Sequence, residues 1–175
     1  TGCGEVNLEH ARLCGMCRTS LVADGAAAEG DGGKLVTVVT SDLKGSTALY
    51  ERLGDARAYH LVREHFAFLG DLVRRHEGAI VKTIGDAVMA AFADPPGAVR
   101  AALAIQRKIA EFNAQQGDGA VIIKLGLHKG PCIAVTLNDR LDYFGGTVNL
   151  AARLQGQSVG GDIVLSESLL GDPAV

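Results

Sequence analysis

Two aspartates stand beside short apolar segments, in a pattern that fits metal-assisted chemistry. Asp42 follows the run Val38–Ser41, and Asp86 follows Gly85 between two further apolar runs. Strands formed by such β-branched and apolar residues would hold each short carboxylate rigidly at a strand end. Hard divalent cations such as Mg²⁺ are typically bound by one or two carboxylates together with substrate phosphates. The two aspartates therefore indicate nucleotide chemistry.

The hydrophobic pattern predicts interleaved strands and helices that would position these carboxylates. The Gly85-Asp86 step is typical of a tight hairpin turn, 129–131 is expected to form a second turn, and Ser46 or Thr47 is expected to cap a helix. We predict strands over 35–41, 79–83, 88–92, 121–128, 132–137 and 163–165, and helices over 46–53, 55–77, from 95, over 147–154 and over 167–170.

Recurring hairpins among helices favour an α+β fold, in which helices pack on a ferredoxin-like antiparallel or mixed sheet. A split β-α-β arrangement would place the first strand beside the central hairpin. That arrangement would bring Asp42 and Asp86 together.

Composition excludes several classes of function. The chain has 175 residues, of which 47% are hydrophobic and 21% charged, as expected for a globular domain. Its net charge of −3 leaves no broad basic surface for nucleic acid or an anionic membrane. Aromatic residues make up 5%, too few to favour a ferredoxin-like RNA-binding module. No apolar run approaches the roughly 20 residues of a membrane span.

Three of the four cysteines crowd the N-terminus. Cys14 and Cys17 form a C-x-x-C knuckle, and Cys3 is similar to the second half of another. We expect a partial zinc ribbon over 1–21 that binds Zn²⁺ through Cys3, Cys14, Cys17 and an unseen ligand, with His10 as an alternative. Three unbound thiols are the other interpretation, and either state suits a reducing cytoplasm. A flexible Gly/Ala/Asp linker is expected over 22–33, before a globular domain over 34–175.

The remaining cysteine and the histidines give weaker signals. Cys132 lies in an apolar run and is expected to be a small core residue. The five histidines show no spacing typical of a metal pair. We expect His65 to be half-buried and the other four to lie at the surface.

Three stretches together resemble the class III nucleotidyl cyclase catalytic domain, the family of adenylate and guanylate cyclases. They are DLKGST at 42–47, KTIGDAVMA at 82–90 and LDYFGGTVNLAAR at 141–153. The resemblance runs from about Leu35 to Leu169 and implies a ferredoxin-like sheet related to the polymerase palm, working as a dimer. It also implies that the domain continues with further strands beyond Val175. The zinc ribbon is not part of this family and indicates an unknown regulatory partner.

The resemblance implies roles at the metal and phosphate end of the site. Asp42 and Asp86, with the carbonyl of Leu43, would bind two Mg²⁺ or Mn²⁺ ions that activate the ribose 3′-hydroxyl and clamp the phosphates. The backbone N–H groups of the next segment run into a helix N-terminus and would cradle the β- and γ-phosphates. That segment comprises Lys44, Gly45 and Ser46.

The resemblance also implies residues that read the base and stabilise the transition state. A lysine only donates and an ionised aspartate only accepts, so Lys82 and Asp142 would complement adenine, whereas guanine inverts both groups. ATP is therefore expected over GTP. Asn149 would orient the ribose, and Arg153 would meet the charge that grows on the α-phosphate. Their i, i+4 spacing places both on one helix face.

In this family the metal aspartates come from one subunit, and the base-reading and transition-state residues come from the other. The chain carries all six, so we expect a homodimer with two composite sites that converts ATP to 3′,5′-cyclic AMP and pyrophosphate. The alternative is a catalytically inactive cyclase-like module that binds nucleotide or dimerises for regulation. A diguanylate cyclase is disfavoured, because the hairpin at 84–87 reads IGDA and lacks the Gly-Gly-(Asp/Glu)-Glu-Phe run.

Overall fold

The computed structural model describes residues 34–137 and 140–175. The predicted zinc ribbon and linker lie outside the described residues and stay predictions. No helix within the two described ranges is long and apolar enough to cross a membrane. The elements are β1 (Lys34–Leu43), α1 (Ser46–Leu53), α2 (Asp55–Arg75), β2 (Gly78–Ile84), β3 (Ala87–Phe92), α3 (Pro95–Ala114), the 3₁₀ turn η1 (Gly117–Gly119), β4 (Ile123–Leu137), β5 (Arg140–Phe144), α4 (Gly146–Gln157), β6 (Ile163–Leu165) and α5 (Glu167–Leu170).

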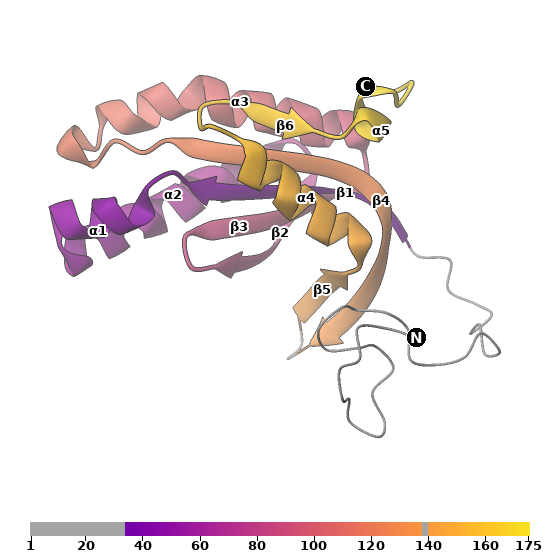
Figure 1. The fold of residues 1–175 in the computed structure, drawn as a ribbon, viewed down its shortest axis with the longest axis horizontal. Coiled ribbons are helices and arrows are strands. Elements are labelled where there is room, and N and C mark those ends of the chain that lie inside the picture. The colour runs from indigo at the N-terminus through magenta and orange to yellow at the C-terminus, as the bar shows by residue number, and fades with distance from the viewer. Residues whose placement is uncertain (1–33, 138–139) are drawn as a thin grey trace, which may run out of the picture. The chain divides into compact units, whose positions relative to one another are not determined.

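The strands form one sheet in the order β2-β3-β1-β4-β5 (Figure 1). The neighbours along this path are antiparallel, and β6 pairs with β4 in parallel. The first strand therefore lies beside the central hairpin β2–β3, with Ser41 opposite Val88. This confirms the predicted α+β fold with a mixed sheet and the split β-α-β arrangement.

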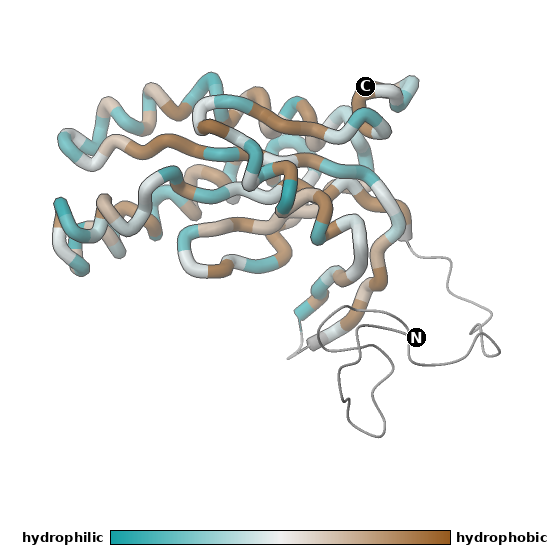
Figure 2. Tube along the Cα trace, viewed as in Figure 1, coloured by the Kyte–Doolittle hydropathy of each residue, from teal (hydrophilic) through white to brown (hydrophobic). Residues whose placement is uncertain are grey.

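Each face of the sheet carries its own apolar core. Alternation along β1 sends Val39 and Leu43 into a large cluster with α1, α2 and α3. Val38 points to the other face, where it joins a smaller cluster with Cys132 and the α4 residue Ala151. Figure 1 shows α4 crossing β1 and β4 on this second face, and Figure 2 shows that the strands carry much of the hydrophobic sequence. Cys132 is 1% exposed, as expected for a core residue.

The predicted turn at 129–131 is wrong, because β4 runs unbroken from Ile123 to Leu137. Gly130 and Pro131 pair with β1 inside this strand. On the opposite edge, β6 pairs with 125–127 and β5 pairs with 133–137, so Pro131 falls between them. A proline lacks the N–H that a ladder needs, and this gap is a place in the sheet where that lack is tolerated.

The expected side-chain cap on the first helix is also wrong. Gly45 is the N-cap of α1 with a left-handed φ of 72°, and no side chain caps the helix. Glycine adopts this conformation without steric cost. By contrast, α3 begins at the predicted proline pair, and the Asp94 carboxylate accepts a hydrogen bond from the Gly97 N–H at 2.9 Å. The first backbone N–H groups of α1 thus have no side-chain partner, unlike those of α3.

Candidate active site

The two aspartates meet where the central strand β1 ends beside the β2–β3 turn. Asp42 is the penultimate residue of β1, and Asp86 occupies the turn between β2 and β3, next to β1. Burial raises the pKa of Asp42, and the neighbouring negative charge of Asp86 raises it further. Oδ2 of Asp86 is buried and has no hydrogen-bond partner among the described residues. A cation bound here would offset the repulsion between the two carboxylates and give the unpartnered oxygen a binding partner.

The donor set fits Mg²⁺ or Mn²⁺ with a bound nucleotide. Within the described residues, no group of three or more His, Cys, Asp and Glu side chains gathers to hold a metal ion alone. Mg²⁺ usually keeps several waters and uses one or two carboxylates plus substrate phosphates, so a pair of aspartates is enough. The Leu43 backbone hydrogen-bonds to the Asp42 carboxylate and opposes the rise in its pKa.

Lys124 is a neighbour of this pair that the sequence reasoning missed. It lies opposite Asp42 in the pairing of β1 with β4, and its positive charge lowers the pKa of Asp42. Lys124 reaches Asp42 only through the register between β1 and β4, which are far apart in the chain. The sequence around Lys124 carries no motif that announces a site.

The predicted phosphate-binding segment leads directly from β1 into α1. Lys44 is exposed, and its backbone N–H donates to the Ile122 carbonyl at 2.9 Å, which fixes the segment to the start of β4. Gly45 then turns the chain, and Ser46 opens the helix. Helix N-termini with free N–H groups are ready sites for anions. A cavity of about 320 Å³ against this turn is lined by Lys44, Gly45 and Arg52, so two cationic side chains lie close by.

Lys82 and Asp142 form a direct ion pair between β2 and β5. Nζ of Lys82 donates to Oδ2 of Asp142 at 2.8 Å and lies 5.0 Å from the ring centroid of Phe144. Oδ1 of Asp142 accepts from the Tyr143 N–H at 2.7 Å. The side chains are 32% and 16% exposed, respectively, so the pair is partly withdrawn from water. The structure therefore brings together the two predicted base-reading residues, which are 60 positions apart.

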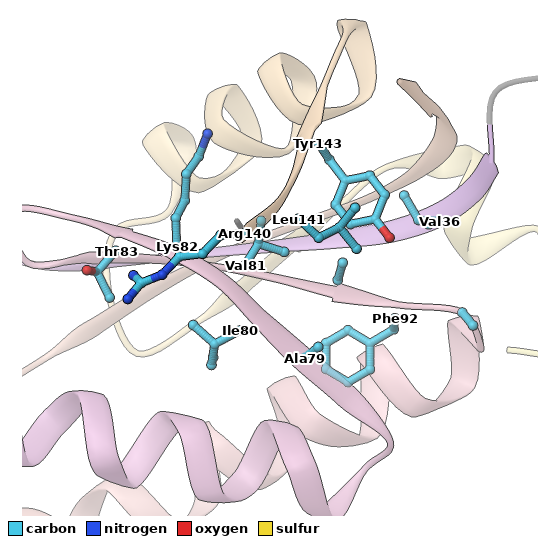
Figure 3. A pocket seen from close by; sticks show the side chains of 12 residues that line it. Val36, Ala79, Ile80, Val81, Lys82, Thr83, Phe92, Arg140, Leu141 and Tyr143 are labelled. Carbon is cyan, nitrogen blue, oxygen red and sulfur yellow. The ribbon is translucent and has the colours of Figure 1, made fainter. Parts of the chain in front are cut away.

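A cavity of about 490 Å³ adjoins this pair between β2, β3 and β5. Lys82 and Arg140 supply its cationic groups, and the remaining lining is mostly apolar. Figure 3 shows Lys82 and Arg140 toward one end, with Phe92 and Tyr143 toward the other. An apolar cavity with a few convergent polar groups is the usual form of a small-molecule site.

Asn149 and Arg153 lie on the exposed side of α4. Ala151, midway between them, is fully buried against the sheet. The predicted i, i+4 arrangement on one face is therefore present. Among the described residues, no hydrogen bond or ion pair links either side chain to Asp42 or Asp86.

His65 on α2 was expected to be half-buried but is 0% exposed. Neither ring nitrogen has a hydrogen-bond partner within the described part of the chain. Burial lowers its pKa to about 4, although the negative charge of Asp86 acts in the opposite direction. His65 therefore lies close enough to Asp86 for the charge of that carboxylate to act on its ring. His128, expected at the surface, is half-buried, with Nδ1 2.8 Å from Oγ of Ser166.

Comparison with known proteins identifies the class to which this fold and these residues belong. Residues 31–171 match the adenylate and guanylate cyclase catalytic domain, and the chain belongs to that family. It is 34% identical over 151 residues to an adenylate cyclase of Lachancea kluyveri, covering 75% of this chain and 8% of that protein. The chain spans 8% of the length of this relative and 39% of the length of adenylate cyclase 2 of Rhizobium meliloti, to which it is 34% identical over 143 residues, or 74% of this chain.

Two solved structures show the same fold. The adenylyl cyclase CyaB from P. aeruginosa superposes with a TM-score of 0.70 at 27% identity, with 78% of each chain covered. The guanylate cyclase domain of RhGC from Catenaria anguillulae, in complex with GTP, gives a TM-score of 0.73 at 27% identity, covering 80% of this chain and 82% of that one. Relatives of both substrate classes therefore share this architecture.

Proposed function

We propose that this chain is the catalytic domain of an adenylate cyclase, which converts ATP to 3′,5′-cyclic AMP and pyrophosphate in a homodimer. The observation that carries the proposal is the meeting of Asp42 and Asp86, with a buried Asp86 oxygen that lacks a partner. Family membership makes a nucleoside triphosphate the natural substrate for such a pair. The mechanism then follows from what each neighbouring group can bind.

Two Mg²⁺ or Mn²⁺ ions held by Asp42, Asp86 and the Leu43 carbonyl would supply Lewis-acid activation and charge neutralisation. The N–H groups at the uncapped start of α1 would donate hydrogen bonds to the β- and γ-phosphate oxygens. The ribose 3′-oxygen attacks the α-phosphorus, and the new O–P bond forms as the bond to the bridging oxygen of pyrophosphate breaks. The hydroxyl proton passes to solvent, and pyrophosphate leaves.

The Lys82–Asp142 pair supports ATP as the preferred substrate. The lysine donates to the adenine N1 and the aspartate accepts from the N6 amino group, so both polar edges of the base find partners. Guanine presents a donor and an acceptor in the inverted order. Each charged group would then face a like partner, in a place that is 32% exposed at Lys82 and 16% exposed at Asp142.

The exposed position of Asn149 and Arg153 supports a composite site. Both side chains leave α4 on the side away from its own sheet, so they are available to a second copy of the chain. A twofold dimer uses the same surface on both copies and would complete two sites at once. In each site, Asn149 orients the ribose and Arg153 stabilises the charge on the α-phosphate.

The test is cyclic nucleotide production by the purified full-length protein, with ATP or GTP and with Mg²⁺ or Mn²⁺. We expect cyclic AMP from ATP, and a loss of about 100-fold or more in kcat for Arg153→Ala. Arg63→Ala removes an exposed arginine of α2 and serves as the matched control. Binding of ATP without cyclic product would select the inactive nucleotide-binding module instead. Undiminished turnover by Arg153→Ala would refute the role of α4.

A complementation assay tests the dimer. Asp42→Ala and Arg153→Ala chains are each expected to be inactive alone, and their mixture is expected to regain activity through one intact composite site. A mixture that stays inactive would contradict the proposal of two shared sites.

We also propose that Cys3, Cys14 and Cys17 bind Zn²⁺ in a reducing compartment such as the cytoplasm. The proposal rests on their spacing alone. Elemental analysis of the purified protein should give about one zinc per chain, and Cys14→Ser should remove it. Equal zinc contents in both proteins would contradict it.

A further inference from the structure

A threonine on β1 makes a polar link to α4. Thr40 lies two residues before Asp42, so both side chains point to the same face of the sheet. Its Oγ1 donates to the Ala151 carbonyl at 2.9 Å and lies 3.3 Å from the Gly126 carbonyl of β4. One hydroxyl therefore connects the strand that carries a metal aspartate with a helix and a second strand.

Ala151 lies midway between Asn149 and Arg153, and it is 0% exposed. The helix approaches the sheet closely at this point, because a Cβ added at Gly126 would lie 2.4 Å from the Ala151 carbonyl and 2.2 Å from the Gln155 nitrogen. Only a glycine permits that approach. The apolar contacts there hold α4 against the sheet but do not fix its position along its axis, because hydrophobic packing is not directional. Two hydrogen bonds supply that direction. Oγ1 of Thr147 in the first turn of α4 donates to the Pro131 carbonyl of β4 at 2.7 Å, and Thr40 holds the helix at Ala151, between the two proposed catalytic side chains.

We propose that Thr40 is a positioning residue, whose hydroxyl fixes α4 on the sheet and thereby places Asn149 and Arg153. This inference rests on the proposed cyclase function. In a composite dimer, β1 and α4 of one chain serve different sites. Thr40 therefore affects the site to which its own chain contributes α4. Asp42 of the same chain belongs to the other site, so Thr40 links elements that serve both sites.

The first experiment compares Thr40→Val, which keeps the shape and removes the hydroxyl, with Thr40→Ser, which keeps the hydroxyl. A displacement of about 1 Å at a reacting centre costs up to about 100-fold in rate. We expect Thr40→Val to lower kcat by about 10-fold while KM for ATP changes less than about 2-fold, because α4 acts in the transition state. Thr40→Ser should stay within about 3-fold of the wild type.

Circular dichroism and thermal unfolding check that both variants fold. A folded Thr40→Val with wild-type kcat would overturn the proposal. So would a Thr40→Ser variant as slow as Thr40→Val, because the hydroxyl would then be irrelevant.

The second experiment decides which site Thr40 serves. In the mixture of Asp42→Ala and Arg153→Ala chains, the single intact site takes its carboxylate from the Arg153→Ala chain and its α4 from the Asp42→Ala chain. We expect Thr40→Val to slow turnover more when it is placed on the Asp42→Ala chain. Equal effects, or the reverse order, would overturn the Thr40 inference alone. An inactive starting mixture would instead overturn the composite site, and this inference with it.

Discussion

The buried His65 leads to a prediction that needs no substrate. Its pKa is lowered to about 4 in the folded chain, from 6.5 when the ring is in water, chiefly by burial. Between pH 6.5 and pH 4, His65 is mostly protonated in the unfolded chain but mostly neutral in the folded chain. The stability that neutral His65 allows is therefore complete above pH 6.5 and is lost as the pH falls toward 4.

The expected magnitude follows from that difference. A pKa difference of one unit corresponds to about 1.36 kcal/mol, so the total loss of folding free energy approaches about 3 kcal/mol at low pH. About 2 kcal/mol of this loss is expected by pH 5. For a domain of this size, 2 kcal/mol shifts Tm by about 8 °C. His65→Leu removes the titrating group and keeps an apolar side chain of similar volume. It should also be more stable than the wild type at pH 7.5, because a buried polar ring without partners costs about 1–3 kcal/mol.

Thermal and urea unfolding at pH 7.5 and pH 5.0, in EDTA, measure both effects. Other titrating groups are common to both proteins, so the difference between them isolates His65. His60→Leu is the matched control, because the His60 side chain is 67% exposed and changes its environment little on folding. Equal losses of Tm in the wild type and His65→Leu between these pH values would refute the reasoning.

Three further predictions concern the carboxylate pair, the base-reading pair and the contact of α4 with β4. Because the pKa of Asp42 is raised in the folded chain, its ionisation lowers the stability of the fold above pH 4. Without metal, Asp42→Asn should therefore have a higher Tm than the wild type at pH 7. With saturating Mg²⁺, the wild type should gain about 2–3 kcal/mol of stability that Asp42→Asn does not gain. Lys82→Met should lower kcat/KM for ATP by about 10-fold or more and narrow the preference over GTP; an unchanged ratio of the two would remove Lys82 from base recognition. Gly126→Ala should lower the free energy of unfolding by about 1–3 kcal/mol. Gly70→Ala, where the added Cβ meets only the exposed Arg74 guanidinium at 3.2 Å, should leave that free energy nearly unchanged when both are measured by urea unfolding.

Much of the fold could be predicted, because its elements carry local signals. The alternation in β1, the Gly85-Asp86 turn and the proline pair at the start of α3 all depend on neighbours in sequence. The meeting of Asp42 and Asp86 followed from one topological step, which placed the first strand beside the hairpin. Local pattern and topology agreed there, so the proximity of the two carboxylates was predicted, while their binding of metal ions stays a prediction.

The features that the sequence reasoning missed depend on long-range register. Gly130 and Pro131 indicate a turn when read locally, but β1 on one edge keeps β4 extended through them. Lys124 reaches Asp42 only through the same pairing. His65 lies on a periodic helix face, and its position there predicts partial burial but not the complete loss of hydrogen-bond partners.

The contact between Lys82 and Asp142 has a consequence for how the proposed enzyme would recognise its substrate. The two groups satisfy each other at 2.8 Å before any base arrives, so entry of a nucleotide is an exchange of hydrogen bonds rather than a gain. In the proposed enzyme, adenine would replace the hydrogen bonds that it disrupts, whereas a base with inverted edges would break the ion pair and give no hydrogen bond in return. Such an exchange would favour adenine, because the wrong base would leave both charged groups without a suitable partner.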